Sequence, residues 1–155
     1  LVDSIRQTIP EIALRTTVIA GHPGETENHF EEMYHFVEKM RFDRLGVFQY
    51  SHEIDTHSYS MPDDIRAEVK EERTDLLMEL QQGISQELNA KKVGNTYKVL
   101  FDRKEGDYFI GRTEFDSPEV DNEVLVHANQ YARLGDFANV KINSSEEFDL
   151  YGEIV

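Results

Sequence analysis

Apolar positions in the first third of the chain follow three successive patterns. The run "IALRTTVIAG", which begins at Ile12, is rich in β-branched residues and predicts a mostly buried strand. After a turn that contains Gly and Pro, apolar residues recur at helical spacing over residues 30–40, and Thr26 is the expected N-cap. Residues 44–51, "RLGVFQYS", predict a second buried strand. Strand, helix and strand at this spacing predict a βαβ unit with parallel strands.

A longer helical pattern occupies residues 62–92. Pro62, which two aspartates follow, is expected in the first turn of this helix. One apolar stripe then extends from Ile65 to Leu88. A helix of this kind is most simply a connector, which packs one face on a core while it carries the chain to another part of the protein.

From residue 93 the helical spacing gives way to short alternating segments that turns separate. Five segments predict strands: "NTYKVLFD", "YFIGRTEF", "EVLVHA", "FANVKIN" and "FDLYGEIV". A small five-stranded antiparallel barrel is the expected solution, because closure removes most sheet edges. Gly111, inside one of these strands, suits a sharp bend of the barrel.

These patterns predict an α+β protein in three parts, residues 1–61, 62–92 and 93–155. The first part is too small to form a sheet that is covered on both faces, because it offers two parallel strands and one helix. We therefore expect this chain to be the C-terminal part of a longer α/β protein.

Composition narrows the possible chemistry. The chain has no cysteine, so it offers no disulfide, no thiolate nucleophile and no cysteine ligand for iron or zinc. No segment approaches the roughly 18 apolar residues of a membrane helix, and no signal-peptide pattern is present. A cytoplasmic location is therefore expected.

The chain is strongly acidic. Its 16 basic and 31 acidic side chains give a formal net charge of −15, which disfavours polyphosphate partners. Residues 93–155 carry 13 acidic and 6 basic side chains. Two explanations stay open: a surface that keeps the protein soluble, or a surface that attracts a basic macromolecule.

The ends of the two predicted strands form a candidate binding edge. Ligands of parallel sheets lie beyond the carboxyl ends of the strands, where Gly21 and residues 48–51 are expected. The alternative is that the glycines and Pro23 only shape a tight corner, while Arg15 pairs with a carboxylate. The candidate residues at this edge and on the strand that precedes it are Arg15, Thr17, Gly21, Phe48, Gln49 and Tyr50.

The histidines give no strong indication of a metal site. His29 and His35 lie six residues apart in a predicted helix and do not share a face. His52 and His57 are close to two carboxylates in a loop, a combination that can chelate a metal. Solvated loop histidines are the simpler expectation, so no metal ligand is predicted.

Several segments resemble one enzyme family. The strings "RTTVIAGHPGETENHF" and "RFDRLGVFQYSHEIDT" are similar to the last two strands of the radical S-adenosylmethionine barrel in methylthiotransferases. The strings "GRTEFDSPEVDNEVLV" and "GDFANVKINSSEEFDLYGEIV" resemble the TRAM domain of the members that modify ribosomal protein S-twelve. The resemblance covers essentially the whole chain, although His22 stands where Phe is usual and "HEIDTH" replaces a loop that is often richer in Gly and Pro.

The resemblance implies an activity for the intact enzyme. It implies addition of a methylthio group to the β-carbon of an aspartate in ribosomal protein S-twelve, with S-adenosylmethionine and two four-iron four-sulfur clusters as cofactors. The cluster cysteines are absent from this chain, so we expect the chain alone to be inactive. The resemblance assigns adenine or ribose contacts to the strand ends, and Arg15 or Thr17 are candidates for contacts with the methionine part.

The predicted barrel supplies the candidate substrate contacts. TRAM domains usually help to bind RNA, but this acidic barrel better suits a lysine- and arginine-rich ribosomal protein. Arg112 either orients a carboxylate of the partner or pairs with Glu114 or Asp116. A tRNA methylthiotransferase and a TRAM-centred binding module without an enzymatic parent are the alternatives. The candidate substrate-binding residues are Arg112, Glu114, Asp116, Glu119 and Asp121.

Overall fold

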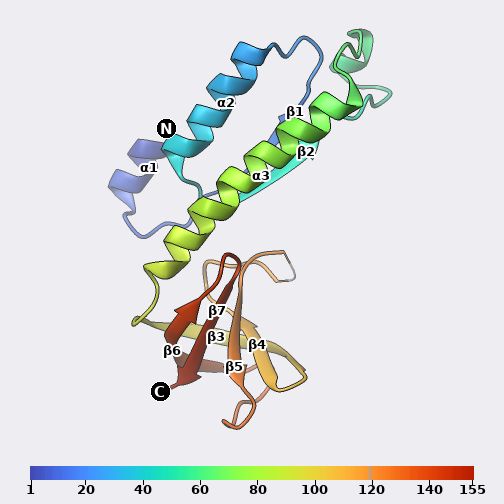
Figure 1. The fold of residues 1–155 in the computed structure, drawn as a ribbon. Coiled ribbons are helices and arrows are strands. Elements are labelled where there is room, and N and C mark those ends of the chain that lie inside the picture. Colours follow the sequence, from blue (N-terminus) through green and yellow to red (C-terminus); the bar gives the residue numbers. More distant parts are fainter. Residues whose placement is uncertain (119) are drawn as a thin grey trace. The chain divides into compact units, whose positions relative to one another are not determined.

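The computed structural model describes residues 1–118 and 120–155, in two compact units, Leu1–Ile84 and Ser85–Val155 (Figure 1). The first unit contains α1 (Val2–Thr8), β1 (Arg15–Ala20), α2 (Glu27–Met40), β2 (Arg44–Gln49), the 3₁₀ helix η1 (His57–Ser60) and most of α3 (Ala67–Ala90). Within the described residues, no helix has the length and apolar character that crossing a bilayer requires.

The predicted βαβ unit is confirmed. Strands β1 and β2 pair in parallel, and Ile19 is the register partner of Phe48. Helix α2 begins where the sequence indicates, because the Thr26 hydroxyl accepts the backbone N–H of His29 at 3.3 Å. The imidazole of His29 accepts the Thr26 N–H in return, which completes a reciprocal cap.

Helix α1 was not anticipated from the sequence. The side chain of Arg6 in this helix donates hydrogen bonds to the backbone carbonyls of Met40 and Arg41, the latter at 2.9 Å. These carbonyls belong to the C-terminal end of α2, where helical backbone acceptors have no partner within the helix. Helix α1 therefore caps the C-terminal end of α2, although the two segments lie far apart in the sequence.

Helix α3 begins at Ala67, so the prediction that Pro62 lies in its first turn is wrong. The two aspartates after Pro62 make tertiary contacts: Asp63 pairs with Lys70 at 2.7 Å, and Asp64 accepts the Gly24 N–H at 3.0 Å. These contacts hold the segment before α3 against the rest of the unit in a nonhelical conformation.

Helix α3 runs antiparallel to β2. Gln81 donates to the Phe42 carbonyl before β2 begins, at 2.9 Å, and Lys70 donates to the Tyr50 carbonyl after β2 ends, at 3.4 Å. Leu77 and Ile84 of the predicted apolar stripe are buried. The buried apolar residues of this unit are Ala20, Phe30, Val37, Met40, Phe42, Leu45, Leu77 and Ile84.

The second unit contains the predicted five-stranded closed barrel. Its strands are β3 (Thr96–Glu105), β4 (Tyr108–Arg112), β5 (Glu123–His127), β6 (Phe137–Ser145) and β7 (Asp149–Ile154), in the order β3-β4-β5-β7-β6. One detail differs from expectation, because β5 and β7 pair in parallel whereas the other pairings are antiparallel. A closed ring of five strands cannot reverse direction at every pairing, so at least one parallel pair is unavoidable.

Alternating side chains fill the barrel interior. A cluster of valines together with Phe101, Ile142 and Leu150 is at most 1% exposed. Gly111 is needed where β3 and β4 approach closely, because a β-carbon there would overlap the Leu100 carbonyl oxygen and the Val99 side chain. The neighbouring strand β3 has a register shift between Phe101 and Arg103, and Phe101 is the register partner of Gly111.

Candidate functional site

The carboxyl ends of β1 and β2 lie side by side. The Tyr50 N–H donates to the Ala20 carbonyl at 2.9 Å, and Gly21 follows directly. The predicted residues at the two strand ends therefore form one edge, as the parallel pairing requires.

One face of the two-stranded sheet presents three of the predicted residues. Side chains alternate along a strand, so Arg15, Thr17 and Phe48 share a face with Ile19. Ile19 is 52% exposed and Phe48 is 62% exposed, which makes them an uncovered apolar pair beside the strand ends. Gln49, the register partner of the buried Ala20, lies on the other face of the sheet.

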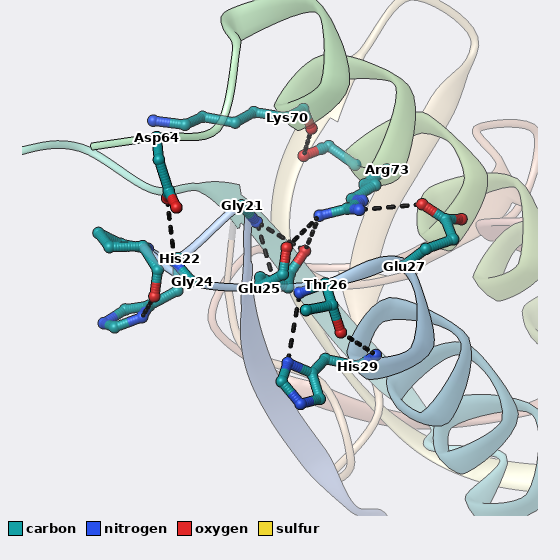
Figure 2. Close-up of polar contacts among 12 residues, drawn as sticks. Gly21, His22, Gly24, Glu25, Thr26, Glu27, His29, Asp64, Lys70 and Arg73 are labelled. Atoms are coloured by element: carbon teal, nitrogen blue, oxygen red, sulfur yellow. Dashed lines mark hydrogen bonds and ion pairs between the residues drawn. The ribbon is translucent and has the colours of Figure 1, made fainter. Parts of the chain in front are cut away.

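The turn after β1 is held by a buried ion pair (Figure 2). Gly21 has a φ of 77°, and its N–H lies 3.1 Å from both carboxylate oxygens of Glu25. The same carboxylate pairs with Arg73 of α3 at 2.7 Å. The backbone donor of Gly21 is therefore used within the turn, and its contribution to a ligand site is the shape of the corner.

Two cations of α3 reach this corner. Arg73 also pairs with Glu27 at 3.0 Å, and its guanidinium carbon lies 5.3 Å from the Phe30 ring centre. Lys70 lies over the Tyr50 ring, 5.1 Å from its centre. The side chains of Arg73 and Lys70 are only 7% and 8% exposed.

Neither cation was among the predicted site residues, although the sequence carries a signal for both. The stripe predicted within residues 62–92 comprised apolar residues alone. Lys70 and Arg73 precede Leu77, Gln81 and Ile84 at spacings of three and four residues, so they extend the buried face toward the start of α3.

His22 closes the exposed side of the turn. Its Nδ1 lies 3.1 Å from the Pro23 carbonyl and its Nε2 lies 2.8 Å from the Ser58 hydroxyl. A carbonyl can only accept, so Nδ1 donates to the Pro23 carbonyl, and in the neutral ring Nε2 accepts from Ser58. The ring meets Tyr50 edge to face at 5.2 Å, an aromatic contact of the kind that a Phe at this position can also form.

The loop histidines lie among aromatic and polar neighbours. The ring centres of His52 and Tyr59 are 4.6 Å apart, and the Tyr50 hydroxyl lies 3.3 Å from Nδ1 of His52. His57 begins the 3₁₀ helix η1. No group of three or more potential metal ligands occurs in the part of the chain that the structure describes.

The candidate residues of the barrel have distinct environments. Arg112 pairs with Asp102 of β3 at 3.2 Å, a partner that was not among those predicted. Asp116 is buried and accepts the Thr113 hydroxyl at 2.6 Å, whereas Asp121 accepts the Ser117 N–H at 2.7 Å. Glu114 is exposed, and Glu119 lies outside the described residues.

Arg112 stands between two hollows of the barrel surface. The first, of about 280 Å³, is lined in part by Arg112 and by the Arg103–Glu123 pair, whose closest N–O distance is 2.7 Å. The second, of about 380 Å³, is lined in part by Arg112, Lys98 and Phe137. Phe137 is 61% exposed, and the Lys98 ammonium lies 4.5 Å from its ring centre. This surface thus offers charged and aromatic contacts to a macromolecule.

Comparison with known proteins agrees with these features. Residues 93–155 match the TRAM domain family. Over its full length the chain is 69% identical to "Ribosomal protein uS12 methylthiotransferase RimO" of Cytophaga hutchinsonii. Over 99% of its length it is 55% and 52% identical to the proteins of the same name from Christiangramia forsetii and Flavobacterium johnsoniae.

The match covers 36%, 34% and 35% of these three relatives, so the chain spans about a third of their length. It includes both units of the structure, the strand-end turn as well as the barrel. The predicted resemblance to methylthiotransferases is therefore confirmed: this chain matches a segment of proteins named RimO, and its residues 93–155 are a TRAM domain.

Proposed function

We propose that the intact protein is a methylthiotransferase that adds a methylthio group to the β-carbon of an aspartate in ribosomal protein uS12. The observation that carries the proposal is the 69% identity over both units with a relative of that name. Residues 1–61 belong to the cofactor-binding barrel, residues 62–92 connect it to the TRAM barrel, and the TRAM barrel recruits the substrate. A cytoplasmic location agrees with a ribosomal substrate.

The residues beside the strand ends fit S-adenosylmethionine. Ile19 and Phe48 offer an exposed apolar platform for an adenine ring, and Thr17 offers a hydroxyl on the same face. Arg15, two residues before Thr17 at the start of β1, lies on the same face and suits the carboxylate of the methionine part. When bound, S-adenosylmethionine and the two clusters supply the radical and sulfur chemistry, and these residues hold and orient the cofactor.

The iron–sulfur clusters do not fit this chain. Their usual ligands are thiolates, and the chain has no cysteine. Their ligands must therefore come from other residues of the intact protein, and residues 1–155 alone are proposed to be inactive.

The TRAM barrel is proposed to recruit uS12 through charge. A barrel with 13 acidic and 6 basic side chains attracts a basic protein and speeds its encounter. Glu114 is exposed and lines the second of the two hollows together with Arg112, so it is the best placed of the described candidates to meet a lysine or arginine. Asp116 and Asp121 instead support the loop through their own hydrogen bonds.

A tRNA substrate is the second candidate, and one observation favours it. An exposed aromatic ring beside a cation, as at Phe137 and Lys98, is the arrangement on which single-stranded bases stack. The net charge of the barrel opposes this interpretation, because phosphates would meet an excess of carboxylates.

Binding assays with the full-length protein separate these candidates. We expect binding to purified uS12 that weakens as salt is raised, and that Glu114→Lys reduces several-fold at low salt. Glu31→Lys, an equal charge change at an exposed position of α2, serves as the control. Tighter binding to a tRNA anticodon stem-loop than to uS12 would overturn the substrate assignment. Mass spectrometry of uS12 after reaction with the cluster-loaded enzyme then tests for the added methylthio group.

A further inference from the structure

We propose that Arg73 and Lys70 are positioning residues that hold the carboxyl ends of β1 and β2 in the shape that S-adenosylmethionine requires. This inference rests on the proposed function, which places the cofactor at these strand ends. Both residues belong to α3, so the connecting helix would help to shape the cofactor site.

Arg73 fixes the end of β1 through Glu25. Its Nη1 lies 2.7 Å from Oε1 of Glu25, and the Glu25 carboxylate in turn receives the Gly21 N–H (Figure 2). The Nη2 atom binds Glu27 at the start of α2. A planar guanidinium that bridges two carboxylates sets direction as well as distance, so it fixes the turn relative to both α2 and α3.

Lys70 fixes the end of β2 and covers the corner of β1. Its ammonium binds both oxygens of Asp63, at 2.7 and 2.9 Å, and the Tyr50 carbonyl at 3.4 Å. Its methylene stem packs against Gly21, where no β-carbon would fit. One side chain therefore touches both strand ends.

A purely structural interface would not need this arrangement. Buried charges lose hydration, and well-packed apolar residues often stabilise a protein as well as a buried ion pair does. Here the polar contacts converge on Gly21 and Tyr50, while the apolar pair Ile19 and Phe48 stays exposed beside them. This convergence on the strand ends is what points to positioning rather than to packing alone.

The test measures binding of S-adenosylmethionine to the full-length protein by calorimetry, with thermal unfolding and amide hydrogen exchange on the same samples. We expect Arg73→Gln and Lys70→Met to raise the Kd by about tenfold or more, because small displacements of positioning groups have large effects. Exchange of the Gly21 amide should quicken in Arg73→Gln. Arg73→Lys keeps the positive charge but cannot bridge the carboxylates of Glu25 and Glu27, so an intermediate Kd is expected.

Gln81→Ala is the matched control. Gln81 is buried on the same helix and binds a backbone carbonyl, but at the opposite end of β2. It should lower thermal stability without changing the Kd. An unchanged Kd in folded Arg73→Lys and Lys70→Met, or an equal rise in Gln81→Ala, would overturn the positioning role while the proposed function stands. A wild-type protein that binds no S-adenosylmethionine would overturn the proposed function, and the positioning role with it.

Discussion

Lys70 and Gly21 are in direct contact, and the stem of the lysine occupies the space that a side chain on residue 21 would need. The lysine head is tied to Asp63, so the stem is not free to move aside. Gly21 also has a left-handed backbone conformation, with a φ of 77°. The turn after β1 thus depends on glycine for two separate reasons.

Gly21→Ala should destabilise the first unit by about 2–4 kcal/mol. The left-handed conformation contributes about 1–2 kcal/mol and the overlap with Lys70 contributes the rest. Urea unfolding followed by circular dichroism measures the loss. Gly24→Ala is the matched control, since Gly24 has a φ of 78° but open space around its would-be β-carbon. Equal losses in the two variants would show that the contact with Lys70 contributes nothing.

Removal of the N-terminal cap of α2 should lower the free energy of unfolding by about 1 kcal/mol. Thr26→Ala loses the hydroxyl that accepts the His29 N–H, whereas Thr26→Ser keeps it. We expect the alanine variant to unfold at lower urea concentration and the serine variant to match the wild type within a few tenths of a kcal/mol. A serine variant as unstable as the alanine variant would mean that the methyl group, and not the cap, stabilises the helix start.

The elements that local patterns define were predictable, and those that tertiary contacts define were not. The Thr26 cap and the alternating barrel strands follow from nearby residues. The start of α3 does not follow from nearby residues in this way, because Asp63 has the character of a helix-start residue but pairs with Lys70. A closed ring with an odd number of strands requires at least one parallel pair, so this pairing was predictable. Which two strands form it was not predictable.

The candidate site was predictable in position but not in its supporting contacts. Parallel pairing places Gly21 beside residues 48–51, as expected. Arg73 was missed because its partner Glu25 lies 48 residues earlier in the sequence, and nothing local marks the pair. The spacing of Arg73 from Leu77 indicates only that the position is buried, and a buried arginine then requires a partner.

Asn89→Asp should destabilise the second unit by about 3 kcal/mol at neutral pH. Asn89 is fully buried, and its amide donates to the carbonyls of Glu146 and Glu147 at 3.1 and 3.0 Å. An ionised aspartate would place an acceptor against two acceptors in a buried site. Asn143→Asp, the same charge change at an exposed position, should stay within about 0.5 kcal/mol of the wild type. Similar unfolding midpoints for the two variants would contradict this account.

Asp149→Asn should stabilise the barrel at pH 7. Burial, followed by repulsion from Glu123 and Glu146, raises the pKa of Asp149 above its ordinary 3.8. The folded state therefore binds this proton more tightly than the unfolded state, and the wild type gains stability as pH falls through the raised pKa. Asparagine carries no charge at any pH, so it avoids the penalty that the wild type has at neutral pH.

The advantage of Asp149→Asn should therefore shrink as pH falls toward 3.8, where the wild-type carboxyl becomes protonated. Urea midpoints at pH 7, 5 and 4 measure this trend. Asp107→Asn, at an exposed turn before β4, controls for the removal of one negative charge from an acidic protein. Two outcomes would show that the Asp149 carboxylate, near Glu123 and Glu146, carries no penalty. One is a lower midpoint than the wild type at pH 7, and the other is a gain that Asp107→Asn matches at each pH.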